Sequence, residues 1–192
     1  DAFAERAFEG NPAAVCPLRE WLPDELMQSI AAENNLSETA FFVPTEDGFH
    51  IRWFTPTLEV ELCGHATLAS ARVLFHHLGY AGERIRFDSK SGPLIVQRER
   101  DWLQLDFPAQ LPIGCDTPPA MLQAFGSTPV ACLKNQDYLV VFENKADVIG
   151  AKPDMTALRK LDLRGVIITA RSDSHDFICR FFAPNYGLDE DP

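Results

Sequence analysis

Cys63, Gly64 and His65 stand together between two stretches of contrasting pattern. Residues 58–62 alternate between apolar side chains and glutamates, which is the period-two pattern of a half-buried strand. Residues 66–78 are almost uniformly apolar, which predicts a helix that is buried on all sides. The sequence therefore predicts a strand that runs into a tight turn, and the turn opens a central helix.

The predicted turn combines a thiol, an imidazole and the start of a helix. The first backbone N–H groups of a helix have no partner within it, and they favour anions. Cys63, Gly64 and Ala66 are therefore candidates for binding a substrate carboxylate, with His65 beside them. A buried cysteine followed by a histidine that caps the helix fits this stretch equally well.

Glu38 lies at a predicted junction between a helix and a strand. Asn34 and Asn35 indicate the end of a helix, and the apolar residues 40–43 indicate a strand. A carboxylate held near a substrate can move a proton from carbon, especially when burial or a second acid raises its pKa. On its own, this pattern is more typical of a surface or capping carboxylate.

The composition excludes several classes of function. The 192 residues carry a net charge of −11, which disfavours nucleic acid as a partner. The longest apolar run is too short to cross a bilayer, so we expect no membrane association. The five cysteines are scattered and form no C-x-x-C pair, and the histidines show no metal-binding spacing with them. We therefore expect a cytoplasmic protein with reduced thiols and without a metal site.

The second half of the chain repeats features of the first. The sequence RWFTP at residues 52–56 matches RFFAP at residues 180–184, and Pro-Asp at residues 23–24 matches Pro-Asp at residues 153–154. Both matches occur in the same order and at nearly the same separation, which indicates a duplicated α+β unit.

This repeat predicts how the chain is divided. Residues 1–108 form the first domain, residues 109–118 form a linker containing prolines and a glycine, and residues 119–192 form the second domain. Extending the alignment without a gap places Cys63 on Asp191. We therefore expect the second domain to be incomplete at its C-terminus, because its copy stops where the first begins its central helix.

Five blocks of the sequence together resemble one known family. They are GNPAAV at residues 10–15, NLSET at 35–39, RWFTP at 52–56, CGHATLA at 63–69, and APNYGLDEDP at 183–192. In this order they resemble the PhzF-like phenazine-biosynthesis isomerase family, which is similar in fold to diaminopimelate epimerase. The resemblance implies an α+β fold with two pseudo-symmetric domains, each a curved, mostly antiparallel sheet wrapped around a central helix, here with the second domain truncated.

The resemblance also implies an activity and its residues. Members of this family carry out cofactor-independent isomerisation, in which a proton is moved on a small cyclic or amino/hydroxy acid, and they are commonly homodimers. The catalytic positions match Glu38, His65 and Asp191. Ser37 is expected to bind the substrate, and so is Asn11, although Asn11 also fits a purely structural turn.

Two other functions remain open at this point. Related racemases and epimerases use a cysteine at the position of Cys63 as a base, so a two-base racemase or epimerase is an alternative. The gap-free alignment opposes Cys63 with Asp191 rather than with a second cysteine, which disfavours a symmetric thiol pair. The third possibility is a catalytically inactive protein that binds a ligand or a partner.

Overall fold

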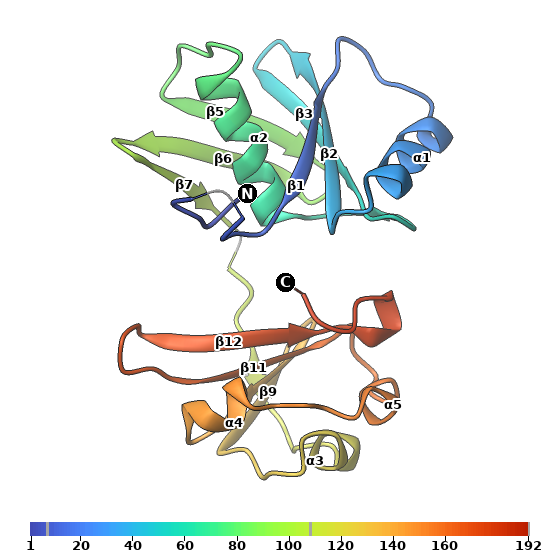
Figure 1. Cartoon of the computed structure of the whole chain (residues 1–192), viewed down its shortest axis with the longest axis vertical. Helices are drawn as coiled ribbons and strands as arrows, with labels where there is room; N and C mark the ends of the chain where they lie inside the picture. Colours follow the sequence, from blue (N-terminus) through green and yellow to red (C-terminus); the bar gives the residue numbers. More distant parts are fainter. Residues whose placement is uncertain (7, 108, 192) are drawn as a thin grey trace. The chain divides into compact units, whose positions relative to one another are not determined.

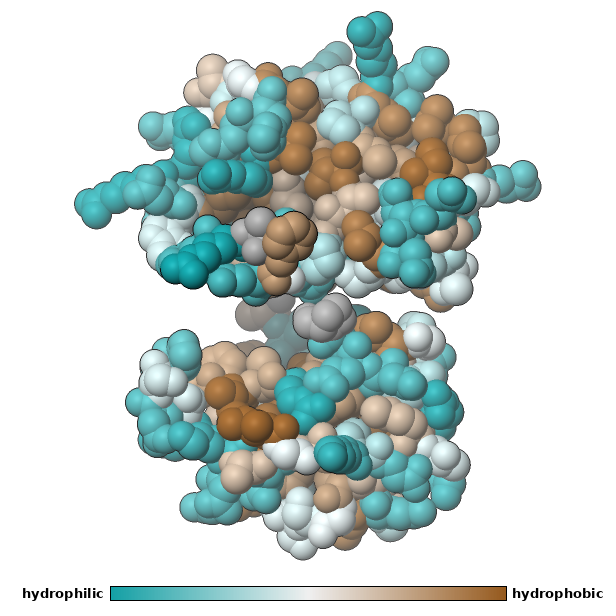
Figure 2. Space-filling model, in the orientation of Figure 1, coloured by the Kyte–Doolittle hydropathy of each residue, from teal (hydrophilic) through white to brown (hydrophobic). Residues whose placement is uncertain are grey.

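The computed structural model describes residues 1–6, 8–107 and 109–191, and it has the expected α+β architecture (Figure 1). The chain divides into two compact units, Asp1–Pro108 and Ala109–Pro192. In the view of Figure 2, hydrophilic side chains project from each unit between smaller apolar areas. Each unit is described by itself below.

The first unit is a curved sheet around one helix. Its elements are β1 (Ala13–Pro17), α1 (Asp24–Asn34), β2 (Glu38–Thr45), β3 (Gly48–Phe54), β4 (Glu59–Val60), α2 (Gly64–His76), β5 (Arg84–Ser89), β6 (Gly92–Glu99) and β7 (Trp102–Asp106). The strand order is β1-β2-β3-β5-β6-β7, with β4 paired to β3. Only β1–β2 and β3–β5 pair in parallel. Helix α2 contacts both edge strands, β1 and β7, so the sheet curls around it.

Helix α2 is the central helix that the apolar run predicted. Seven of its side chains are buried, because the helix faces the sheet on several sides. Gly64 begins it, and a Cβ atom there would lie 2.7 Å from Cζ of Phe107. Any larger residue at this position would therefore require the exposed ring of Phe107 to shift. The helix ends at His76, two residues before the predicted end, and Gly79 follows with a φ of +69°.

Helix α1 begins and ends as its sequence signals indicate. Pro23 precedes it, and Asp24 and Glu25 supply the acidic first turn that a helix dipole favours. The C-cap residue, Asn35, is left-handed. Strand β2 begins three residues later, so Glu38 lies where the chain re-enters the sheet.

The second unit is a five-stranded sheet with short helices. Its elements are β8 (Ile113–Gly114), α3 (Pro119–Phe125), β9 (Ala131–Lys134), β10 (Tyr138–Val141), α4 (Lys145–Ile149), α5 (Met155–Leu158), β11 (Val166–Arg171), β12 (Phe177–Phe182) and the 3-10 helix η1 (Pro184–Tyr186). The strand order is β12-β11-β10-β9-β8. Strand β8 corrects one prediction: it lies within residues 109–118 and pairs with β9, so part of the predicted linker belongs to this unit.

The two units repeat one topology. Strands β1 and β2 are parallel and are joined through α1, and β2 then pairs antiparallel with β3. Strands β10 and β11 are likewise parallel and are joined through α4 and α5, and β11 pairs antiparallel with β12. The pseudo-symmetry expected from the sequence is therefore visible in the order and direction of the strands.

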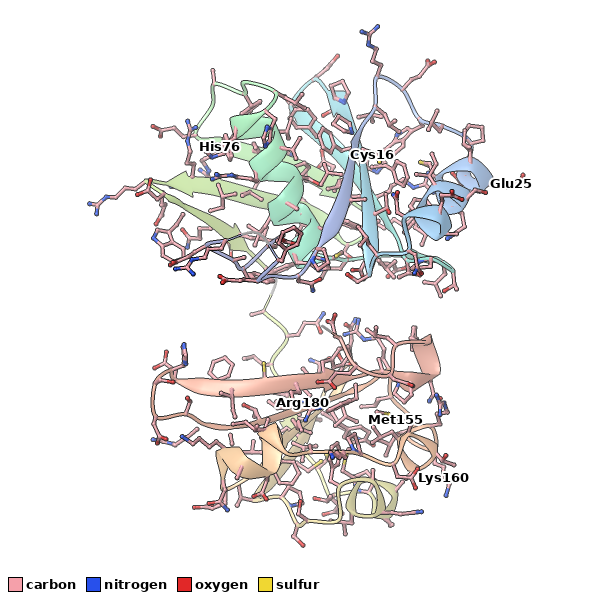
Figure 3. All side chains as sticks on the ribbon, in the orientation of Figure 1. Cys16, Glu25, His76, Met155, Lys160 and Arg180 are labelled. Atoms are coloured by element: carbon pink, nitrogen blue, oxygen red, sulfur yellow. The ribbon has the colours of Figure 1, made fainter. Side chains whose placement is uncertain are left out.

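An arginine–glutamate pair occupies the same place in each repeat. In the first unit, Nε and Nη2 of Arg52 donate to the two carboxylate oxygens of Glu59 at 2.8 and 2.9 Å. In the second unit, Nε and Nη2 of Arg180 donate to those of Glu190 at 2.6 and 2.8 Å. Each guanidinium also lies over a phenylalanine two residues further along its own strand, at 5.1 and 5.0 Å from the ring centroid. In Figure 3, Arg180 is labelled beside β12.

These pairs correct the gap-free alignment of the two halves. The two partners are 7 residues apart in the first unit and 10 residues apart in the second, so the second hairpin is three residues longer. The N–H of Asp191 donates to the carbonyl of Phe181, and in the first unit Val60 pairs with Trp53. Asp191 therefore corresponds to Val60, not to Cys63. Within the described residues, Cys63 therefore has no counterpart in the second unit.

Candidate active site

Two of the predicted catalytic residues meet in the first unit. Glu38 is the first residue of β2, and His65 is the second residue of α2. The Oε2 atom of Glu38 lies 3.4 Å from Nε2 of His65. The Glu38 side chain is 18% exposed and that of His65 is 9% exposed, and the Oε2 atom that faces His65 is buried, so the contact between the two groups is shielded from solvent. The arrangement brings together a proton acceptor and an imidazole from elements that are separate in the sequence.

Ser37 and the turn before β1 line the same side of the imidazole. The hydroxyl of Ser37 lies 3.4 Å from Nε2 of His65. It also lies 3.2 Å from Oδ1 of Asn11 and 3.3 Å from the carbonyl oxygen of Pro12, to either of which it can donate. The predicted residues Asn11 and Ser37 are therefore part of one polar cluster with His65 and Glu38.

Cys63 contacts the other ring nitrogen of His65. Its Sγ atom lies 3.5 Å from Nδ1. Both residues are buried, with 7% of Cys63 and 8% of His65 exposed. The Cys63 carbonyl accepts hydrogen bonds from the hydroxyl and the N–H of Thr67, which anchor the turn to the first turn of α2. The thiol is thus fixed against the imidazole.

The surroundings of His65 favour its neutral form. Burial lowers its pKa, and a hydrogen bond to the Pro12 carbonyl only partly offsets this effect. A neutral imidazole has one N–H and one acceptor nitrogen. If the Cys63 thiol donates to Nδ1, the proton of the ring is on Nε2, which is then the nitrogen that donates to the Pro12 carbonyl and lies 3.4 Å from the carboxylate of Glu38.

The remaining substrate-binding candidates of the first unit lie at the start of α2. Gly64 is its first residue, and Ala66 is completely buried in the core. The side chain of Ala66 therefore cannot touch a substrate, and any contribution from this residue comes from its backbone N–H. The helix start remains a suitable anion site, because the first N–H groups of a helix lack internal acceptors.

Asp191 lies in the second unit, at the end of the hairpin that follows β12. Partial desolvation raises the pKa of its carboxyl, and the guanidinium of Arg164 opposes this shift. The residue lines an open hollow with the paired Arg180 and Glu190. Its convergence with Glu38 and His65 stays a prediction.

A metal ion would find three donor types in the first unit. Glu38, Cys63 and His65 each offer a ligand atom, and these atoms lie within 4.8 Å of one another. Such a mixed donor set is typical of zinc. However, the thiol approaches Nδ1 and the carboxylate approaches Nε2. An ion binds an imidazole through one nitrogen, so this arrangement fits a path for protons better than a metal centre.

The sequence did not reveal two groups that hold the residues of the site in place. The carbonyl of Pro12 and the hydroxyl of Thr67 both fix residues that the motifs did identify. A carbonyl has no signature in the sequence, because every residue carries one. The threonine could have been recognised, since it lies four residues after Cys63 at the first turn of the expected helix.

No helix in the described ranges, 1–6, 8–107 and 109–191, is both long enough and apolar enough to cross a lipid bilayer.

The family model for phenazine biosynthesis-like proteins, PhzC-PhzF, matches residues 1–192. An uncharacterized isomerase of Pseudomonas aeruginosa is 53% identical over 192 residues, which cover 100% of this chain and 74% of that protein.

Solved structures agree with this match. A PhzF-family phenazine biosynthesis protein of Enterococcus faecalis superposes with a TM-score of 0.94 at 47% identity, covering 100% of this chain and 74% of that one. A probable proline racemase of Agrobacterium radiobacter shares the fold alone, with a TM-score of 0.53 at 11% identity over 87% of this chain and 60% of that one. The chain therefore belongs to the PhzC-PhzF family of phenazine biosynthesis-like proteins and is an isomerase of PhzF type.

Proposed function

We propose that the protein moves a proton between two carbon atoms of a small cyclic amino or hydroxy acid, with Glu38 as the acid–base residue and without a cofactor. The observation that supports this proposal is the contact between the Glu38 carboxylate and the imidazole of His65 at the start of α2, whose pKa is lowered by burial. A base for a carbon-bound proton must be within reach of the substrate and must be able to return that proton. The largely shielded Glu38 side chain beside an imidazole supports this role.

The reaction needs only proton transfer. Glu38 accepts a proton from a substrate carbon that lies next to a C=C bond. The electron pair of the broken C–H bond forms a new C=C bond to the adjacent carbon, and the pair of the old C=C bond becomes available at its far carbon. Glu38 then returns the proton to a second carbon, so atoms and electrons balance without an oxidant. His65 donates its Nε2–H toward the carboxylate or the substrate, and the backbone N–H groups of α2 hold the substrate carboxylate.

Cys63 has a positioning role in this scheme. A thiol that donates to Nδ1 fixes the ring proton on Nε2, which is the nitrogen that faces Glu38. Asp191 would supply a second carboxyl near the substrate, consistent with its raised pKa. Both roles assist a reaction in which Glu38 carries the proton.

A two-base racemase or epimerase is the second candidate. The thiol–imidazole contact of Cys63 favours it, because an imidazole can accept the thiol proton and leave a thiolate base. The corrected alignment also removes the earlier objection, since Asp191 is not the counterpart of Cys63.

Replacing Cys63 separates the two mechanisms. If Glu38 is the base, Cys63→Ser should lower the rate of proton exchange less than about 10-fold, because a hydroxyl still donates to Nδ1. The measurement is deuterium uptake by a panel of cyclic amino and hydroxy acids in deuterated water. Cys179→Ser, which changes an exposed thiol of the second unit, is the matched control. A loss of several hundred-fold in Cys63→Ser alone would favour the epimerase.

A further inference from the structure

Two thiols of the second unit lie against each other. Cys115 directly follows β8, and Cys132 is in β9. Their Sγ atoms are 3.6 Å apart, and the N–H of Cys115 donates to the carbonyl of Cys132 at 2.9 Å. Neither residue belongs to the proposed active site, so this contact calls for its own explanation.

The backbone geometry suits a covalent link between these thiols. Strands β8 and β9 are antiparallel, and Gly114 pairs with Leu133, which puts Cys115 opposite Cys132. Residues opposite each other in such a pair have Cα atoms about 4.5–5.5 Å apart, within the roughly 4.4–6.8 Å that a disulfide spans. The sulfur atoms need only approach by side-chain rotation, to about 2.05 Å.

The surroundings give the two thiols different roles. Cys132 is 6% exposed and lies in the core of the second unit, whereas Cys115 is half-buried at its edge. Burial and the neighbouring Cys115 thiol raise the pKa of Cys132 to about 11. Because a thiolate is the nucleophile in disulfide exchange, the more accessible Cys115 is the thiol that meets an oxidant first.

We propose that Cys115 and Cys132 are a redox modification site that forms a reversible disulfide with a low-molecular-weight disulfide such as oxidised glutathione. The Cys115 thiolate attacks one sulfur of that disulfide, forms a mixed disulfide and releases one thiolate. The thiol of Cys132 then loses its proton and attacks Sγ of Cys115, which closes the protein disulfide and releases the second thiolate. Two protein thiols are oxidised, and one small disulfide is reduced to two thiols.

The link would fasten the first strand of the second unit. Strand β8 has two residues and lies at the edge of the sheet, so few hydrogen bonds hold it. The disulfide closes a loop between residues 17 apart in the sequence, which restricts the unfolded chain and also prevents β8 from separating from β9. The expected consequence is slower hydrogen exchange at the amide of Cys115, whose partner is the Cys132 carbonyl.

The test compares the reduced protein with protein held in an excess of oxidised over reduced glutathione. All proteins carry Cys179→Ser, which removes the exposed thiol that could link two molecules. The expected product is monomeric and about 2 Da lighter, because two hydrogens are lost on closure. Peptide mapping should join the peptides of Cys115 and Cys132, and exchange at the Cys115 amide should slow at least several-fold.

Two variants test the order of attack. In Cys132→Ala, which keeps a small apolar residue in the core, Cys115 should retain glutathione as a stable mixed disulfide. In Cys115→Ser, Cys132 should stay unmodified because it is buried. The proposal is wrong if both thiols of the folded parent stay free after oxidation, if the mixed disulfide at Cys115 persists in the parent, or if the mapped link joins other cysteines.

Discussion

Glu38→Gln should lower the rate of substrate deuterium exchange by about 10²–10⁴-fold, which corresponds to about 3–5 kcal/mol of activation free energy. Glutamine keeps the size of the side chain and can still pair with the imidazole of His65, but it cannot accept a proton. The loss should appear mainly in kcat, because the proposed carboxylate-binding site at the start of α2 is unchanged. The measurement is deuterium incorporation into a small cyclic amino or hydroxy acid in deuterated water.

Glu46→Gln provides the matched control. Glu46 is an exposed glutamate directly after β2, the strand that begins with Glu38, so its change removes the same charge outside the polar cluster. This control should exchange at the parent rate. If Glu38→Gln also exchanges at the parent rate, Glu38 is not the base. If the parent itself catalyses no exchange while the tested acid raises its melting temperature, the protein binds ligands without acting on them.

The close approach of Glu38 and His65 could be predicted from the sequence through the family resemblance of the blocks that contain them, and each block also marks the end of an element. The NLSET stretch lies where α1 ends and β2 begins, and CGHAT lies where α2 begins. Once α2 packs inside the curled sheet, the start of the helix must face the start of a neighbouring strand. The distances and the two ring nitrogens involved required the structure, because they depend on side-chain rotamers.

Other features escaped the sequence for physical reasons. The alternating residues 58–62 predicted a full strand, but β4 has two residues, and Leu58 and Leu62 are 39% and 37% exposed. Pairing partners decide the length of a strand, and periodicity does not report them. Strand β8 was missed within the proline-containing residues 109–118 for the same reason, and helix α4 was missed because it has only five residues.

The three extra residues in the second hairpin could not be predicted from the sequence either, although they decide how the two halves align. Short repeats fix the position of an alignment but not its gaps. The two arginine–glutamate pairs and the backbone hydrogen bond of Asp191 showed that Glu59 corresponds to Glu190. This equivalence suggests that the pair holds the hairpin that leads to the active-site turn in the first unit and to Asp191 in the second.

Arg52→Met should therefore destabilise the first unit by about 3 kcal/mol, since removing one partner leaves a largely buried charge poorly compensated. The side chains of Arg52 and Glu59 are 14% and 17% exposed, and the guanidinium also pairs with Asp24 of α1. After the substitution, Lys90 is the remaining described salt-bridge partner of Glu59. The free energy of unfolding in urea measures this effect.

Arg86→Met is the control for losing an arginine on the same sheet. Arg86 forms an ion pair with Asp88, and their side chains are 45% and 41% exposed. This pair should therefore contribute less than about 1 kcal/mol to the free energy of unfolding. The double variant Arg52→Met/Glu59→Gln should be more stable than the sum of the two single changes predicts, because the residues interact directly. Additive effects in this cycle would show that Arg52 stabilises the unit through its other contacts, which are the ion pair with Asp24 and the rings of Phe54 and Trp21, 5.1 and 5.4 Å from the guanidinium.

The pH dependence of the unfolding free energy is an independent test of whether Arg52 stabilises the unit through its charge or through packing. The pKa of Glu59 is lowered, chiefly by its hydrogen bonds with Arg52. The unfolded chain therefore binds a proton at Glu59 at a higher pH than the folded one. The stabilisation is fully present above the unfolded pKa of about 4.3, and it is lost as the pH falls through the lower folded value. The difference in unfolding free energy between parent and Arg52→Met should thus shrink as the pH falls below about 5. A difference that stays constant over this range would contradict an ion-pair origin of the stabilisation by Arg52. The equivalent pair of Arg180 and Glu190 in the second unit would then also be expected to stabilise through packing.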